Sequence, residues 1–194
     1  MTQSTPANVF SRDLIVVKPA HVTAGQLPKY LERASTRYDF LQSAAKTGIA
    51  TDGRMAFRMT RKDIASVKTA SECRAGGKTV TKEMAEGVLQ KNPKTGYSDA
   101  IVIGAQISHE ALSGRRVPDL YLLENTRSGR PTVVDAKFVR MIQARYPHAI
   151  MQVANRKAST TPVLFFDGGE IVGAIMPFVC EVKHLLLQGE PVSP

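Results

Sequence analysis

PTVVDAKFVRMIQARYPHAIMQVANRKASTTPVLFFDGGEIVGAIMPF, residues 131–178, is the stretch that decides the fold. Its opening run of apolar residues, 131–134, predicts a strand. Apolar residues then recur at helical spacing, which predicts a helix over 135–146. Pro147 ends that helix, because proline cannot continue the hydrogen-bonded ladder.

The second half of this stretch is typical of antiparallel strands. A strand is predicted over 149–154, and two more over 161–166 and 171–176. The last two flank Asp-Gly-Gly-Glu at 167–170, a short turn that favours a hairpin. The whole segment is therefore predicted to be a strand, a helix and three antiparallel strands.

The rest of the chain suggests the same unit again. Helices are predicted over 24–35 and 81–90, each leading towards strands. Residues 61–78 are polar and basic and are predicted to be a connecting segment. The remaining predicted strands are 13–18, 40–50, 54–60, 99–108 and 120–125. The expected fold class is α+β, built of repeated helix plus antiparallel-strand units.

The length of 194 residues allows one large domain or two small ones. We expect a first domain over 13–117 and a second, truncated one over 118–180. Residues 1–12 are expected to be a flexible start and 181–194 a tail.

The charge of the chain predicts a polyanionic partner. Lysine and arginine number 26 against 17 acidic residues, a net charge of +9 with a pI near 9.8. Basic side chains that neutralise phosphates release counterions, which favours binding to nucleic acid. Tryptophan is absent and aromatic residues make up 6%, which argues against a single-strand binder that stacks bases. DNA, RNA and an acidic protein remain open as the polyanion.

Cations recur on the predicted helices, which suggests a shared surface facing DNA. A single charged helix face is usually just solvated, but three in a row on a basic chain favour a common role. The candidate DNA-binding residues are Lys29, Arg33, Lys82, Lys91, Lys137, Arg140 and Arg145.

Three short motifs, in this order, resemble a known family. They are ATDGR at 50–54, VPD at 117–119 and IMPF at 175–178. The set resembles the bacterial DNA polymerase sliding clamp (beta subunit) family, in a short form like those of phages and mobile elements. The run from 134 to 178 also looks like the last half-domain of such a clamp.

The resemblance implies a non-enzymatic DNA replication protein without a cofactor. Clamps of this family are rings whose inner helices face duplex DNA without reading its bases. This chain holds about one and a half of their three domains, so a ring implies a homo-oligomer. An apolar pocket binds peptides from polymerases and other partners. Carried over, that pocket would involve Thr51, Gly53, Arg54, Met55, Pro118, Val172, Met176 and Pro177.

The same region permits an enzyme hypothesis. Asp119, followed after fifteen residues by Asp135 and then Lys137, has the spacing of the PD-(D/E)xK nuclease core. There two carboxylates hold Mg²⁺ and a lysine assists the attacking water. Glu83 or Glu86 would complete the site. This hypothesis also requires a helix through 140–157.

A basic adaptor or inhibitor protein, phage-borne and of neither family, is a third alternative. Cys73 and Cys180 lack metal-binding spacing and are expected to be free thiols of a cytoplasmic protein. No membrane partner is expected, because no apolar run reaches the ~18 residues of a membrane helix.

Overall fold

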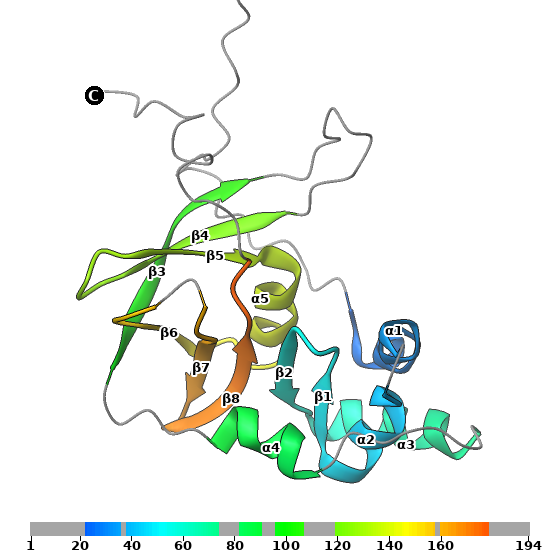
Figure 1. The fold of residues 1–194 in the computed structure, drawn as a ribbon. Helices are drawn as coiled ribbons and strands as arrows, with labels where there is room; N and C mark the ends of the chain where they lie inside the picture. The colour runs from blue at the N-terminus through cyan, green and yellow to red at the C-terminus, as the bar shows by residue number, and fades with distance from the viewer. Residues whose placement is uncertain are drawn as a thin grey trace, which may run out of the picture.

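A computed structural model describes residues 22–35, 38–73, 82–90, 96–106, 119–157 and 160–178. Helices accompany an eight-stranded antiparallel sheet, so the predicted α+β class is confirmed (Figure 1). The elements in chain order are η1 (Ala24–Gln26), α1 (Leu27–Ala34), α2 (Phe40–Thr47), β1 (Ile49–Thr51), β2 (Met55–Arg58), α3 (Arg61–Glu72), α4 (Lys82–Gln90), β3 (Tyr97–Gln106), β4 (Leu120–Asn125), β5 (Pro131–Asp135), α5 (Ala136–Gln143), β6 (Ile150–Ala154), β7 (Val163–Asp167) and β8 (Glu170–Ile175).

The sheet has the strand order β1-β2-β8-β7-β6-β3-β4-β5. β2 pairs with β8, placing Ala56 opposite Ala174, and β3 pairs with both β4 and β6. Strands from both sides of residue 117 thus alternate in one sheet, and they share the main apolar core. The predicted division into 13–117 and 118–180 has no counterpart in this sheet. The predicted start 1–12 and tail 181–194 lie outside the described residues.

Helix α5 lies within the curve of the sheet. The amide of Phe178, just after β8, donates to the carbonyl of Val133 in β5, at 2.7 Å. The chain leaving β8 therefore reaches the strand at the far end of the sheet. α5 contacts β4, β5 and β8, and Figure 1 shows it between β5 and β8. Six of its eight residues are buried, because it is covered on several sides.

Local signals explain why α5 and the final hairpin form where predicted. Asp135 caps α5, its carboxylate accepting from the Lys137 amide at 2.8 Å, which satisfies a donor that the first turn leaves unpaired. The helix ends at Gln143, ahead of Pro147. In the hairpin turn, Gly168 and Gly169 have φ of 58° and 86°. Two successive positive φ values are what a tight hairpin requires and glycine allows.

Two predicted elements were wrong. The strand predicted over 40–50 is mostly α2, with only β1 extended. Asp39 caps α2 by accepting from the Gln42 amide at 3.1 Å, and Gly48, at φ 73°, ends it. The connecting segment predicted over 61–78 contains α3, which starts with reciprocal bonds between Thr60 and Asp63. In both places the helix caps decide the structure.

The predicted repetition of helix and antiparallel strands is present for the two later helices, whereas the helix predicted over 24–35 is followed by α2 before β1 and β2. α4 precedes β3, β4 and β5, and α5 precedes β6, β7 and β8. In the part of the chain that the structure describes, no helix has the length and apolarity needed to cross a membrane.

Candidate peptide and nucleic-acid interfaces

The turn between β1 and β2, residues 52–54, is held by the carboxylate of Asp52. One oxygen accepts from the Arg54 and Met55 amides, at 2.9 and 3.0 Å. The other accepts from the Tyr30 hydroxyl of α1. Gly53 has φ 83°, which glycine adopts without steric cost. The turn therefore has a fixed shape and a fixed place against α1.

The residues after β8 lie directly beside this turn. The Met176 amide donates to the Arg54 carbonyl at 2.8 Å. Pro177 is buried, whereas the Met176 and Phe178 side chains are 45% and 42% exposed. Met176 thus reaches solvent beside the exposed Arg54, and Phe178 reaches solvent two residues further on, where its amide meets Val133 of β5. We call these three residues, Arg54, Met176 and Phe178, the apolar edge.

The other predicted pocket residues contribute in different ways. Thr51 supports the turn, since its hydroxyl donates to the Met55 carbonyl at 2.8 Å. Met55 and Val172 are buried in the main core, so they support the surface but do not line it. Pro118 lies outside the described residues. The first and third motifs therefore meet, and Phe178, absent from the predicted set, is exposed with them.

Tyr30 also links the turn to the first turn of α5. The Lys137 ammonium lies 5.5 Å from the Tyr30 ring centroid and 4.4 Å from that of Phe138, distances at which a cation is attracted to an aromatic ring. Burial raises the pKa of Tyr30 above its usual range, and the negative charges of Asp52 and Asp135 raise it further. The Tyr30 hydroxyl is therefore a stable hydrogen-bond donor to Asp52 at neutral pH.

Four of the seven predicted DNA-binding cations keep some exposure. Lys29 and Arg33 are exposed one turn apart on α1, and Lys137 is half-buried beside Tyr30 of the same helix. Lys82 is exposed on α4, where it pairs with Glu86 at 3.6 Å. Lys91 lies outside the described residues.

The prediction that Arg140 and Arg145 lie on a DNA-binding surface is corrected, because the structure places both side chains inside the protein. Arg140 pairs with Asp119 at 2.9 Å, and its side chain is 4% exposed. Arg145 pairs with Asp63 at 2.8 Å, with 6% of its side chain exposed. Neither guanidinium reaches a surface that a duplex could contact.

The residues of the nuclease hypothesis are partly brought together, but they do not fit a magnesium site. Leu120 pairs with Asp135 across β4 and β5, so the two aspartates are near. Asp119 is bound to Arg140, and Asp135 caps α5. Among the described residues, no group of three or more His, Cys, Asp or Glu side chains could hold a metal ion.

The other features required of the nuclease are also missing. Glu83 lies on α4, which packs against α2, β1, β2 and β8. Residues 150–154 form strand β6, where the hypothesis requires a helix. We therefore derive no catalytic step from these residues.

Several exposed arginines that the helix-based prediction omitted lie in connections between strands, among them Arg127 and Arg156. Arg127 is in the turn after β4, and Arg156 follows β6. Neither belongs to a helical pattern, so their charge was the sole signal in the sequence.

Comparisons of the chain with protein-family models, with curated proteins and with solved structures gave no match.

Proposed function

We propose that this protein is a non-enzymatic, sliding-clamp-like DNA-associated protein. It holds duplex DNA through phosphate contacts and presents the apolar edge to a peptide of a partner protein, such as a polymerase. Several copies would be needed to enclose DNA, so the proposal includes a homo-oligomer.

The observation that carries the proposal is the contact between the turn at 52–54 and the residues after β8. Two motifs that lie 121 positions apart in the chain, Arg54 and Ile175, adjoin through the Met176–Arg54 hydrogen bond and the pairing of Met55 with Ile175. Fixed backbone on both sides leaves Met176 and Phe178 exposed in defined positions. A preformed surface binds a peptide with a smaller loss of conformational entropy.

The chemistry of the apolar edge suggests what the peptide carries. Methionine adapts its shape to different apolar partners, and the Phe178 ring offers a large contact area. The exposed Arg54 favours an acidic residue in the peptide. We therefore propose a short peptide with two apolar side chains and one carboxylate.

The basic charge supports the DNA-binding part of the proposal. The net charge of +9 favours a polyanion, and Lys29 and Arg33 extend from one face of α1. Contacts of this kind read the phosphate backbone and not the bases.

The peptide-binding part is tested with the variant Met176→Ser/Phe178→Ser. Both side chains are about half exposed, so the variant is expected to fold with nearly unchanged stability. We expect the wild type to bind members of a synthetic array of short peptides that carry two apolar residues and one acidic residue. The affinity of the variant for these peptides should be at least tenfold lower, and its affinity for duplex DNA should be unchanged.

The control is Ile150→Ser, which removes an apolar side chain that is 54% exposed on another strand. It should bind the same peptides as the wild type. Equal peptide binding by wild type and Met176→Ser/Phe178→Ser would show that the apolar edge is not the binding surface.

A further inference from the structure

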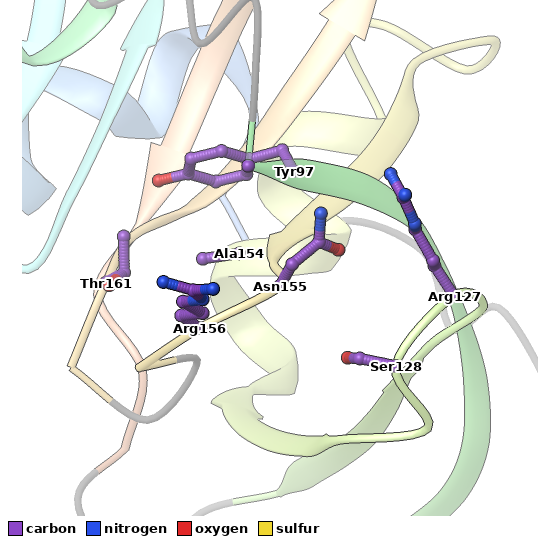
Figure 2. Close-up of a pocket in the computed structure, with 8 residues that line it drawn as sticks. Tyr97, Arg127, Ser128, Ala154, Asn155, Arg156 and Thr161 are labelled. Carbon is purple, nitrogen blue, oxygen red and sulfur yellow. The ribbon is translucent and has the colours of Figure 1, made fainter.

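A cavity of about 610 Å³ opens at the end of the sheet where β3 begins. It lies between the start of β3, the turn after β4 and the loop after β6, and Figure 2 shows its lining. The lining residues are Gly96, Tyr97, Arg127, Ser128, Ala154, Asn155, Arg156 and Thr161. This cavity is separate from the apolar edge, the α1 cations and the nuclease residues.

The lining is positively charged and contains no carboxylate. Arg127 and Arg156 lie on either side of Asn155 in Figure 2. Within the described part of the chain, neither guanidinium has an ion-pair partner. The hydroxyls of Ser128 and Thr161 add polar groups. Two unpaired guanidinium groups around one concave space are the usual means of binding a phosphate group.

The backbone that carries these groups is held in place. The buried side chain of Asn125 accepts from the Arg127 and Ser128 amides, both at 2.9 Å. It donates to the Val153 carbonyl at 2.8 Å and to Asn155 Oδ1 at 3.0 Å. Asn125 thus fixes the turn after β4 to the end of β6, so Arg127 and Arg156 start from backbone of fixed relative position.

The hydrogen bonds of Asn155 leave a donor for the cavity. Its Oδ1 already accepts from Asn125 and from the Ser98 hydroxyl, the latter at 2.8 Å. Its amide Nδ2 has no partner among the described residues. A donor beside two guanidinium groups again favours an anion that offers several acceptor oxygens.

We infer that this cavity is a phosphate-binding site. The phosphate belongs either to the backbone of DNA or to a small phosphate compound, and the DNA source rests on the proposed function. If DNA is the source, the duplex is anchored at loops between strands and not at the predicted helical surface alone.

The test compares Arg127→Ala/Arg156→Ala with Arg61→Ala/Lys68→Ala. Each variant removes two exposed positive charges, and the second pair is on α3, which Figure 1 shows far from β3 and β4. A third variant, Lys29→Ala/Arg33→Ala, tests the helical surface. Affinity for a duplex oligonucleotide is measured over a range of salt. Inorganic phosphate is titrated separately against the arginine side-chain NMR resonances, with chloride at equal ionic strength as the control.

With DNA as the source, Arg127→Ala/Arg156→Ala should lose about tenfold in affinity at low salt. The slope of log K against log salt should fall by about two, because roughly one counterion is released per phosphate contact. Arg61→Ala/Lys68→Ala should change the affinity and the slope far less. Inorganic phosphate should shift the resonances of Arg127 and Arg156 to saturation.

Other results separate the two proposals. If phosphate saturates these resonances while the wild type binds no DNA, the cavity takes a small phosphate compound and the proposed DNA function fails. If DNA affinity is equal in wild type and Arg127→Ala/Arg156→Ala while phosphate still saturates them, DNA is held elsewhere. If phosphate causes no saturable shift, and Arg127→Ala/Arg156→Ala and Arg61→Ala/Lys68→Ala weaken DNA binding equally, the inference is overturned, because only total charge matters.

Discussion

Arg145→Ala is expected to lower the free energy of unfolding by about 3–5 kcal/mol, the usual loss when one partner of a buried ion pair is removed. Arg145 binds both oxygens of Asp63, at 2.8 and 3.0 Å. It also donates to the carbonyls of Val22 and Met141. Asp63 is fully buried, so the variant leaves a carboxylate in the core without its cation.

Asp63→Ala should cost a similar amount, since it also removes one partner of the capping box of α3. Asp63 accepts from the Thr60 amide and hydroxyl, at 3.0 and 2.6 Å. The double variant Arg145→Ala/Asp63→Ala should lose clearly less than the sum of the single losses, because no unpaired charge remains. Urea unfolding of all four proteins measures this coupling. Additive losses would show that the pair does not link α3 to the segment that follows α5.

The same pair gives a pH dependence of known sign. Burial by itself raises the pKa of Asp63, but the hydrogen bonds from Arg145 and Thr60 and the charge of Arg145 outweigh it, so the pKa lies below the usual 3.8. Because folding lowers this pKa, the ionised Asp63 carboxylate stabilises the folded protein above pH 3.8. That contribution is lost as the pH falls through the pKa of the folded state. Asp63→Asn should therefore show a flatter loss of stability in acid than the wild type.

Gly173→Ala is expected to lower the free energy of unfolding by about 1–3 kcal/mol, the usual cost of overpacking a core. An added Cβ at Gly173 would lie 2.8 Å from Ile142 Cδ1 and 3.1 Å from Cγ2. Isoleucine is branched at Cβ and has little rotamer freedom on a helix. Either Ile142 leaves its rotamer or α5 moves away from β8.

Gly25→Ala is the matched control, because nothing lies within 4 Å of the added Cβ. It should be neutral or slightly stabilising. Ile142→Val should recover part of the loss in Gly173→Ala, since it removes the closest methyl. Thermal or urea unfolding measures each difference. A neutral Gly173→Ala would mean that α5 does not pack against β8 at this distance.

The elements that the sequence predicted correctly have strong local signals. The helix at α5 has its cap, its periodicity and Pro147, and the hairpin of β7 and β8 has two successive glycines. α2 and α3 were missed although Asp39, Gly48, Thr60 and Asp63 are ordinary cap residues. The short apolar run at 40–50 fits a strand as well as a helix, so periodicity alone did not separate them.

The burial of Arg140 and Arg145 could not be predicted from the sequence. A cation on a helix is usually exposed, and the partners of Arg140 and Arg145 are 21 and 82 positions away in the chain. Only tertiary packing shows that α5 is covered on several sides. The meeting of the two motifs at the apolar edge was expected from the family resemblance. The cavity of Arg127 and Arg156 was not, because its residues come from separate loops.

In the proposed function, this protein holds duplex DNA by its phosphates without cutting it. The most direct test measures the affinity of the wild type for two duplexes of unrelated sequence over a range of salt, with Mg²⁺ or with EDTA. We expect equal affinities for the two sequences, a linear fall of log K with log salt, and intact DNA in both conditions. Binding that is absent at low salt, or metal-dependent cleavage that Asp135→Ala abolishes, would contradict it.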